Sequence, residues 1–511
     1  MKVRRCGESA LLVETDEVLG WYAALTDRPL SGVVDLVPAA RTLLVRYDST
    51  VDFEGLVARL SELTPAEPSA VTGDPVTIPV RYDGEDLDEV AAGLGMSVAE
   101  VVSVHSGADY TVAFTGFAPG FGYLTGLDER LRLPRRDSPR TRVPAGAVAV
   151  AGEYTGVYPR PSPGGWHLLG STTASLWDPS REPPALLLPG TTVRFEAVTS
   201  LPAAERPAAP ASVVDGGIEV VHCGPLGTVQ DTGRPGYASL GVGRSGSADK
   251  AAAALANRLV GNEPTAALLE ISFGATLAFR VPARVAVTGA EATLTRGGRG
   301  EALNAPFDVA AGQELTIGPA SVGLRTYVAV RGGMATESTL GSRSTDVLSG
   351  LGPAELSPGM VLPIGSEHAG PPPAVQVAPV PALSTSDLEV RVLLGPRDDW
   401  FTSPEALFAG EYTVTAESNR VGVRLSGPAL TRARDGELPS EGMVAGAIQV
   451  PPGGEPIVFL ADHPVTGGYP VIGVVAEKDL SMMAQARPGQ KVRFRPSGTP
   501  RRSGARSPRG T

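Results

Sequence analysis

The sequence predicts a mainly β protein with some α-helix, divided into several domains of short strands. The chain has 511 residues, with 62 Gly and 47 Pro. These two make up about a fifth of it, against roughly 12% in average proteins. Gly and Pro interrupt helices and end strands, which argues against a helical bundle or an α-solenoid. Because 42% of the residues are hydrophobic, the chain can still bury cores, and its length predicts about three to four units.

Residues 1–66 are expected to form a small α+β unit. Residues 10–14 (ALLVE) and 42–47 (TLLVRY) have strand composition, and residues 51–63 carry apolar side chains at helical spacing. Residues 64–75 contain three Pro and form a plausible connector.

Residues 67–200 alternate short β-type runs with turns, which predicts a β domain. A helix is expected at 86–94, continuing through 98–105, with Asp86 as its N-cap. Residues 201–217, rich in Pro and Ala, are the best candidate for a domain linker.

Residues 218–495 are predicted to form two lobes of strands with a Pro-rich joint at 371–381. An Ala-rich helix is expected at 247–260, since Ala favours helix and Gly261 can end it. Residues 496–511 hold four Arg and no acid, and we expect a disordered basic tail.

Charge and cysteine content narrow the function classes. The net charge of −11 argues against a nucleic-acid binder or a protein of anionic membranes. Two Cys allow neither a disulfide framework nor a Cys-rich zinc site, and the five His show no metal-binding spacing. Without a signal segment at Met1 or an apolar run of 18 residues, we expect a soluble, cytoplasmic protein.

Two distant stretches share one pattern. Residues 145–150 (AGAVAV) precede 164–170 (GGWHLLG), and residues 445–450 (AGAIQV) precede 467–473 (GGYPVIG). Chance similarity in a Gly- and Ala-rich chain is one interpretation. The favoured interpretation is a duplicated β-barrel in which a Gly-Gly turn allows close backbone approach to a ligand or a strand.

In the first half, Gly, Pro and aromatic residues are most concentrated in GFAPGFGYL at 116–124, which predicts an aromatic-walled loop. His105 stands before it as an acid/base candidate or as a helix-end residue that caps carbonyls. Arg140 suits anion binding or a surface ion pair. Trp166 belongs either to the core or to a ligand wall.

The second half carries QDTGRPG at 230–236, SGSAD at 245–249 and GSRST at 341–345. The last of these is rich in N–H, hydroxyl and guanidinium donors and can cradle an anion. The alternative is a polar turn, and Ser247 or Asp249 can simply cap the following helix.

Together these strings resemble the allophanate hydrolase subunit 1/subunit 2 superfamily. Its members include the B and C subunits of bacterial 5-oxoprolinase, Kip-type kinase inhibitors and the carboxyltransferase region of urea carboxylase. The first half carries GFAPGFGYL, PR-x3-PR, VPAGAVAVAG and SPGGWHLLG, and the second carries VQDTGRPGY, SGSADKAAAALANRLVGN, GSRST, SNRVGVRL, SEGMVAGAIQVPPGGEPI and TGGYP. Over about residues 1–495 the chain resembles a natural B–C fusion. His463-Pro464-Val465 departs from the family pattern and leaves the role of that segment open.

The resemblance implies cyclophilin-like β-barrels, one in the B part and two related lobes in the C part. It implies ATP-dependent opening of 5-oxo-L-proline to L-glutamate, in which a separate partner, the A-type component of 5-oxoprolinase, completes the hydrolysis. ATP is the expected cofactor, and Mg²⁺ accompanies it without an identifiable ligand set. No nucleic acid or membrane partner is expected, and a homo-oligomer is left open.

The implied reaction needs cations against phosphates and groups that move protons. The candidates for proton transfer are His105, Asp231, Asp249 and Asp462. Substrate or nucleotide contacts are expected at Arg140, Gly164, Gly165, Trp166, His167, Gln230, Arg234, Arg343, Ser344, Thr345, Arg420, Arg424, Gln449, Thr466, Gly467, Gly468 and Tyr469, and no metal ligand is predicted.

Two rival functions stay open. A carboxyltransferase of a urea carboxylase-like biotin system would need a biotinylated partner, since the chain has no biotinyl Lys motif. A non-enzymatic Kip-type regulator of a histidine kinase fits a fused chain poorly, because inhibitor and antagonist would be locked together.

Overall fold

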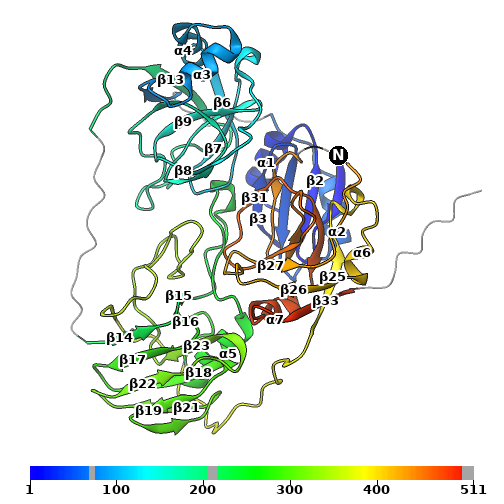
Figure 1. The fold of residues 1–511 in the computed structure, drawn as a ribbon. Coiled ribbons are helices and arrows are strands. Elements are labelled where there is room, and N and C mark those ends of the chain that lie inside the picture. Colours follow the sequence, from blue (N-terminus) through cyan, green and yellow to red (C-terminus); the bar gives the residue numbers. More distant parts are fainter. Residues whose placement is uncertain (68–74, 204–215, 435, 437, 498–511) are drawn as a thin grey trace, which may run out of the picture.

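The computed structural model describes residues 1–67, 75–203, 216–434, 436 and 438–497. It confirms a mainly β protein and contains four units along the chain: an N-terminal unit, a first barrel, a two-sheet lobe and a second barrel (Figure 1). The expected linker at 201–217 and tail at 496–511 lie mostly outside the described residues.

The N-terminal unit is an antiparallel sheet of order β1-β2-β4-β3 with two helices. The predicted helix at 51–63 is confirmed, and it starts where the Asp52 carboxylate accepts the Gly55 N–H at 2.7 Å. The elements are β1 (Lys2–Arg5), β2 (Ala10–Glu14), α1 (Val18–Asp27), β3 (Val33–Pro38), β4 (Thr42–Tyr47) and α2 (Phe53–Ser61).

The first barrel is a seven-stranded sheet of order β12-β9-β10-β7-β6-β13-β5. A bridge between Arg81 and Ser171 joins its two ends, which curls the sheet closed. The elements are β5 (Val76–Val80), α3 (Leu87–Leu94), α4 (Val98–Ser106), β6 (Asp109–Thr115), β7 (Gly122–Thr125), η1 (Glu129–Leu131), β8 (Arg140–Val143), β9 (Ala147–Ala151), β10 (Tyr154–Val157), β11 (Ser162–Gly164), β12 (His167–Ser171) and β13 (Thr192–Ala197).

The helix expected from 86 to 105 is interrupted. Gly95 ends α3 in the left-handed conformation, and Ser97 begins α4 with a capping box to Glu100. Asp86 occupies the N-cap position of α3 but makes no side-chain cap bond, because its carboxylate is used elsewhere.

The two-sheet lobe has a six-stranded sheet, β20-β19-β22-β17-β14-β24, and a five-stranded one, β15-β16-β23-β18-β21, where a barrel-like lobe was expected. Side chains of both sheets share one core. Its elements are β14 (Ile218–Cys223), β15 (Leu226–Gln230), η2 (Ala238–Leu240), α5 (Lys250–Val260), β16 (Leu268–Ser272), β17 (Ala275–Phe279), β18 (Ala283–Glu291), β19 (Leu294–Arg296), β20 (Arg299–Glu301), β21 (Pro306–Val309), β22 (Glu314–Ile317), β23 (Val322–Val330) and β24 (Val361–Leu362).

The second barrel is closed, with order β25-β32-β29-β30-β27-β26-β33. The Pro-rich joint at 371–381 leads into it without forming a helix or strand. The elements are β25 (Leu388–Leu394), η3 (Asp398–Trp400), α6 (Ala406–Ala409), β26 (Glu411–Val414), β27 (Gly422–Ser426), β28 (Glu441–Gly442), β29 (Ala447–Gln449), β30 (Ile457–Phe459), β31 (Thr466–Gly467), β32 (Val471–Val475), η4 (Glu477–Asp479), α7 (Leu480–Ala484) and β33 (Lys491–Pro496).

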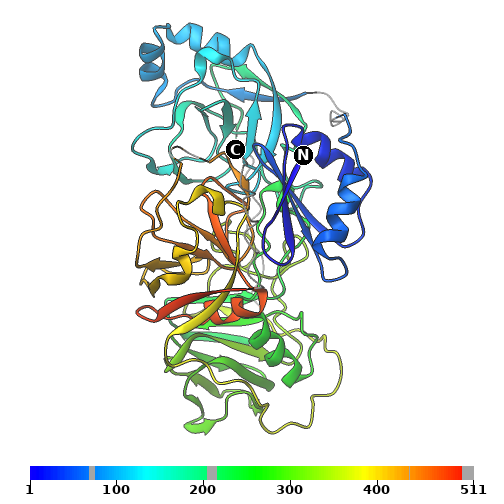
Figure 2. The ribbon, with the colours of Figure 1, turned by 90° about the vertical axis from the view of Figure 1, so that its right-hand side faces the viewer.

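The N-terminal unit packs against the second barrel, at the other end of the chain (Figure 2). Alternate residues of β2 serve its two faces: Leu11 and Val13 join the core of the unit itself, while Ala10 and Leu12 join Met443 and other barrel side chains. Since successive strand residues point to opposite faces, this double packing explains why ALLVE is apolar almost throughout.

The repeated sequence pattern folds alike in both copies. β9 pairs with β12 in the first barrel, and β29 pairs with β32 in the second. A short ladder accompanies each pair: β8 with β11 in one, and β28 with β31 in the other. Each short ladder leads into a Gly-Gly turn, as the duplication interpretation predicts.

Candidate functional site

The two Gly-Gly turns face one shared cavity of about 180 Å³ between the barrels. Sites that take small ligands are typically concave and largely apolar, with a few convergent polar groups. The lining residues of the first barrel are Phe117, Phe121, Tyr123, Arg135, Tyr158, Pro163, Gly164, Gly165 and Trp166, and those of the second barrel are Ser440, Thr466, Gly467 and Gly468.

Aromatic rings form most of the wall on the first-barrel side. The Phe121 ring meets Tyr158 and Trp166 edge-to-face, with ring centroids 5.2 and 5.6 Å apart. Such contacts stabilise a rigid wall. Phe117 lies on the same loop, is 37% exposed and has a φ of 61°, so its backbone holds a conformation that L residues rarely adopt.

Polar groups enter the cavity from both barrels. Among the described residues that line it, Arg135 is the one cation, and Ser440 and Thr466 supply hydroxyls. Burial raises the pKa of Tyr123 to about 12, although Arg135 and Ser440 act to lower it. Burial also raises the pKa of Tyr158. Both phenols therefore stay protonated at neutral pH and can donate hydrogen bonds to a ligand.

Asp86 binds the backbone of the segment that follows the first Gly-Gly turn. Its Oδ2 accepts the Leu168 N–H at 2.7 Å, and its Oδ1 accepts from Arg136 at 2.8 Å and Arg140 at 2.7 Å. Burial alone would raise the pKa of Asp86, but Arg140 and the Leu168 N–H outweigh it and lower that pKa. Arg140, predicted to bind an anion, is thus paired with a carboxylate within the protein.

Close contacts favour glycine at two cavity positions. A Cβ on Gly164 would overlap the Tyr158 hydroxyl. A Cβ on Gly467 would lie 2.8 Å from Nε2 of Gln449, which donates to the Tyr469 carbonyl at 3.0 Å. Each turn is therefore packed directly against the side chain of a neighbouring strand or loop.

Six residues predicted for ligand binding line the cavity together: Gly164, Gly165, Trp166, Thr466, Gly467 and Gly468. Three more lie next to these turns without lining it. His167 binds the Pro134 carbonyl through Nε2 at 3.0 Å, Gln449 is buried, and Tyr469 is exposed.

His105 lies in the core of the first barrel and away from the cavity. Its ring is hydrogen-bonded to the Tyr82 hydroxyl and to Thr155, both at 2.8 Å, and it stacks on Phe195. Burial lowers its pKa to about 3. It is therefore a neutral core group at physiological pH, without access to substrate.

Arg420 and Asp462 form a buried pair that joins the second barrel to the two-sheet lobe. The Arg420 guanidinium binds both oxygens of Asp462, at 2.8 and 2.9 Å, and also binds Glu270. Burial would raise the pKa of Glu270, but Arg420 and Arg325 outweigh it and lower it. Every charge of the group has a partner inside the protein, which indicates a structural junction.

The GSRST segment folds back on Asp231. That carboxylate accepts the Ser342 and Ser344 hydroxyls, both at 2.6 Å, and the Arg343 N–H at 2.7 Å. The neighbouring candidates are bound to backbone: Gln230 donates to the Thr345 carbonyl, and Arg234 donates to the Ser344 carbonyl. The Arg343 side chain stays exposed.

The last two candidates also lie away from the cavity. Asp249 caps α5 by accepting the Ala252 N–H at 3.1 Å, and it accepts a bond from Gln485 at 3.0 Å. Arg424 is exposed on β27. The structure thus brings together the two glycine turns and distributes the predicted charged residues over several separate networks.

Sequence analysis missed several lining residues, namely Phe117, Phe121, Tyr123, Arg135, Tyr158 and Ser440. The first three belong to the GFAPGFGYL loop, whose aromatic wall was expected as a feature but not assigned residue by residue. Arg135 stands in the PR-x3-PR string, where Arg140 was chosen instead. Nothing in the sequence brings Ser440 close to the first barrel.

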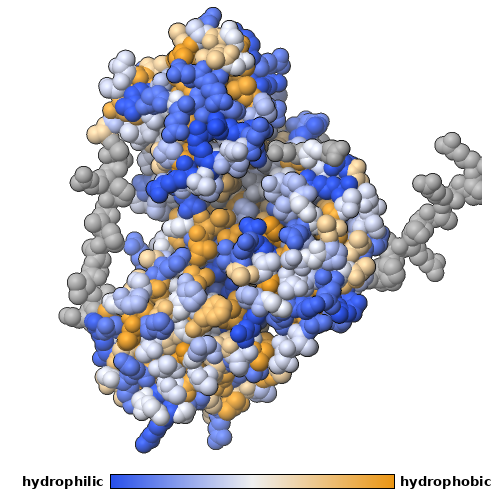
Figure 3. Space-filling model, viewed as in Figure 1, coloured by the Kyte–Doolittle hydropathy of each residue, from blue (hydrophilic) through white to orange (hydrophobic). Residues whose placement is uncertain are grey.

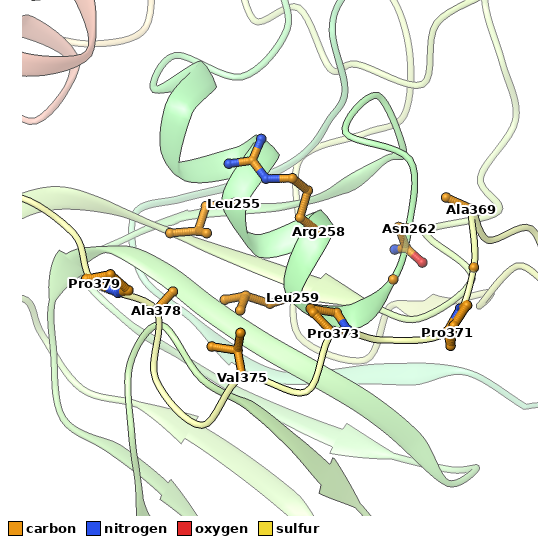
Figure 4. A pocket seen from close by; sticks show the side chains of 12 residues that line it. Leu255, Arg258, Leu259, Asn262, Ala369, Pro371, Pro373, Val375, Ala378 and Pro379 are labelled. Atoms are coloured by element: carbon orange, nitrogen blue, oxygen red, sulfur yellow. The ribbon is translucent and has the colours of Figure 1, made fainter.

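A second cavity, of about 500 Å³, lies between α5 and residues 369–379 (Figure 4). Leu255, Leu259 and Val375 point into it, whereas the guanidinium of Arg258 extends away from it. Its lining is almost wholly apolar, so it lacks groups for acid–base chemistry.

Within the described residues, no group of three or more His, Cys, Asp or Glu could hold a metal ion. A search of the same residues finds no helix long and apolar enough to cross a membrane.

Comparison with known proteins defines the class. The family described as carboxyltransferase domain, subdomain A and B, matches residues 240–496, and the family of subdomain C and D matches residues 1–187. The chain belongs to this carboxyltransferase-domain family. Its two parts are homologous to the B and C subunits of 5-oxoprolinase, joined here in one chain.

The C-like part is 36% identical to the 5-oxoprolinase C subunit of Escherichia coli K12, over 54% of this chain and 90% of that protein. The B-like part is 39% identical to the 5-oxoprolinase B subunit of Escherichia coli O157:H7, over 38% of this chain and 96% of that protein. Urea amidolyase of Lachancea kluyveri is 35% identical over 54% of this chain, which spans only 17% of that enzyme. The crystal structure of TTHA0988 matches with a TM-score of 0.84 and 36% identity, over 97% of this chain and all of that one.

Proposed function

We propose that the chain is a component of an ATP-dependent 5-oxoprolinase, which activates 5-oxo-L-proline for ring opening to L-glutamate together with a separate A-type component. The observation that carries this proposal is the cavity between the two Gly-Gly turns, where the B-like and C-like parts meet. Its volume of about 180 Å³ is below the roughly 300–1,000 Å³ of pockets for drug-sized ligands, and it suits a small cyclic amide better than a nucleotide.

The lining groups match the parts of such a substrate. Arg135 can form a charge-assisted bond with its carboxylate. The aromatic wall of Phe121 and Trp166 can pack against its ring. The protonated hydroxyls of Tyr123 and Tyr158 can donate to a carbonyl oxygen or to a negative charge that develops on it.

The proposed chemistry explains the need for ATP. The lactam carbonyl is a poor electrophile because of amide resonance. Transfer of the terminal phosphoryl group to the carbonyl oxygen gives ADP and an activated imidate phosphate. Water then attacks the ring carbon and the C–N bond opens to give a γ-glutamyl phosphate, which a second water hydrolyses to L-glutamate and phosphate. Since the described residues form no carboxylate cluster for a metal, Mg²⁺ would be carried by the phosphates of ATP.

The test combines the chain with its A-type partner, 5-oxoproline and Mg-ATP, and measures glutamate and ADP. Absence of ADP above background with all components present would overturn the proposal. Arg135→Met should raise the KM for 5-oxoproline at least ~10-fold with little change in the KM for ATP, since it removes a charge-assisted bond. Arg132→Met, an exposed neighbour outside the cavity, is the matched control.

The similarity to urea amidolyase favours a second candidate, a carboxyltransferase of a biotin system. In that case the cavity would receive carboxybiotin from a partner protein. Co-purification with a biotinylated protein, and biotin-dependent carboxylation of a urea-like amide without ADP formation by the chain, would select it over the 5-oxoprolinase.

A further inference from the structure

Each Gly-Gly turn has an ionised side chain on the strand opposite it. In the ladder of β8 and β11, Arg140 is the register partner of Gly164. In the ladder of β28 and β31, Glu441 is the register partner of Gly467. The Arg140 guanidinium is bound by a carboxylate of its own barrel, Asp86. The two copies therefore carry opposite charges at the same place, and the partner expected for Glu441 is a cation.

Arg397 supplies that cation and binds a second carboxylate as well. Its Nε donates to Oε2 of Glu441 at 2.9 Å and its Nη2 donates to Oε1, so the pair is bidentate. The remaining Nη1 donates to Glu14, the last residue of β2 in the N-terminal unit. The side chains of Arg397 and Glu441 are only 8% and 7% exposed, so solvent screens their link little.

The N-terminal unit holds the same segment of the second barrel by two further contacts. The Ala40 N–H, between β3 and β4, donates to the Ser440 carbonyl at 3.1 Å. A Cβ on Gly442 would lie 2.5 Å from Cβ of Leu44 on β4. Three successive residues, 440–442, are therefore attached to the N-terminal unit: one by a backbone bond, one through the shared guanidinium and one by close packing.

This segment acts on the cavity through its partner strand. Ser440 lines the cavity itself, and β28 pairs with Thr466 and Gly467, which line it too. Thr466 also lies against the GFAPGFGYL loop of the first barrel, since a Cβ on Gly116 would lie 2.0 Å from the Thr466 Oγ1. A shift of β28 would therefore move one wall of the cavity relative to the other.

The network itself lies outside the cavity. Among the described residues, Glu14, Arg397 and Glu441 are not part of the lining, so they do not contact a ligand bound there. Arg4 completes the compensation of charge, because its Nε donates to Glu14 at 2.6 Å and its Nη2 donates to Asp399 at 3.2 Å. Side chains locked in this way can hold the groups of a site in place without touching the ligand.

We propose that the N-terminal unit positions the second Gly-Gly turn, and that the Glu14–Arg397–Glu441 network is the link through which it does so. Arg397 has the part at the second turn that Asp86 has at the first, with the charges exchanged. Both are positioning residues, one supplied within the first barrel and the other tied to the N-terminal unit. The positioning follows from these contacts alone, whereas its effect on turnover rests on the function proposed above.

Hydrogen–deuterium exchange of the full chain tests the link without requiring turnover. Glu14→Ala removes the outer carboxylate and leaves the pair of Arg397 and Glu441 intact. We expect backbone exchange in the segments that contain β28 and β31 to become at least ~3-fold faster, because they lose an attachment. The corresponding segments of β8 and β11 in the first barrel should not change. Glu17→Ala, which removes an exposed carboxylate of the same unit, is the matched control and should alter neither pair of segments.

Arg397→Lys is the second variant, because lysine keeps the cation but cannot reproduce the planar fork that binds two carboxylates. It should accelerate exchange in the same segments. With the A-type partner, and at a temperature at which each variant is folded, both variants should lower kcat/KM for 5-oxoproline at least ~10-fold, since a misplacement of about 1 Å can cost about a hundredfold.

The outcomes separate this proposal from the reaction proposed above. Unchanged exchange of the β28 and β31 segments in both variants overturns it, and so does faster exchange spread equally over both barrels, which would indicate a general loss of stability. Local acceleration in an active chain whose kcat/KM stays unchanged also overturns it. If the unmodified chain forms no ADP, the proposed reaction fails, and local acceleration then supports the positioning by itself.

Discussion

The Asp86 carboxylate and the Leu168 backbone N–H are joined at 2.7 Å, which ties the segment before α3 to the strand that follows the first Gly-Gly turn. The same carboxylate binds Arg136 and Arg140. Asp86 therefore positions one wall of the cavity without touching a ligand there.

Asp86→Asn should weaken this support, because the amide cannot accept from two guanidinium groups and a backbone N–H as a carboxylate does. We expect a loss of about 2 kcal/mol in the free energy of unfolding and a higher KM for the proposed substrate, 5-oxoproline. Urea unfolding and steady-state kinetics measure both. Glu89→Gln removes an exposed carboxylate 3.5 Å from Arg136 and should change neither quantity.

Gly164→Ala should displace the Tyr158 hydroxyl, since the added methyl group would overlap it. Because that hydroxyl lines the cavity, we expect kcat/KM to fall by at least about tenfold, with a loss of about 1–3 kcal/mol in stability. Gly93→Ala, on the exposed face of α3 and outside the cavity, is the control, as its methyl group would meet no atom within 4 Å. Equal kinetics for the two variants would contradict the role given to Tyr158.

Arg420→Met should be the most destabilising of these changes, because it leaves Glu270 and Asp462 buried without their shared cation. Breaking a buried pair in this way typically costs about 3–5 kcal/mol. Urea unfolding followed by tryptophan fluorescence measures it. Arg424→Met, in an exposed position four residues away, should stay within about 0.5 kcal/mol of the unmodified chain.

Asp346 gives the protein a pH-dependent stability. Burial and the neighbouring Asp462 raise its pKa above the usual value of an Asp. The protonated form is favoured in the folded state, so this contribution is fully present below the unfolded pKa of about 3.9 and is lost as the pH rises through the folded pKa. Asp346→Asn, which cannot ionise, should raise the Tm at pH 7–8. Its advantage should shrink as the pH falls towards 4, and a constant difference in Tm would show that Asp346 does not titrate.

Local signals in the sequence were sufficient for much of the fold. Apolar spacing predicted α2, and the Ala-rich run ended by Gly261 predicted α5. The repeated AGA and Gly-Gly strings predicted two strand pairs of one design. These features depend on neighbours a few residues apart, which the sequence displays directly.

Contacts between distant segments could not be predicted in the same way. The acid/base interpretation of His105 assumed solvent access, and only the folded barrel shows its ring packed on Phe195. Arg420 and Asp462 are residue types common in active sites, yet here their side chains form an ion pair with each other. The cavity itself depends on bringing Ser440 to the first barrel, a contact that no local pattern encodes.

Apolar surface gathers at the waist of the molecule, between the first barrel and the two-sheet lobe (Figure 3). The apolar face of the N-terminal unit is itself covered mostly by the second barrel, because Leu12 and Leu44 share a core with barrel residues such as Met443. During synthesis, this face emerges from the ribosome long before the segment that covers it. The nascent chain therefore exposes an apolar sheet until its last barrel has folded. During that period the exposed sheet makes the chain prone to aggregation.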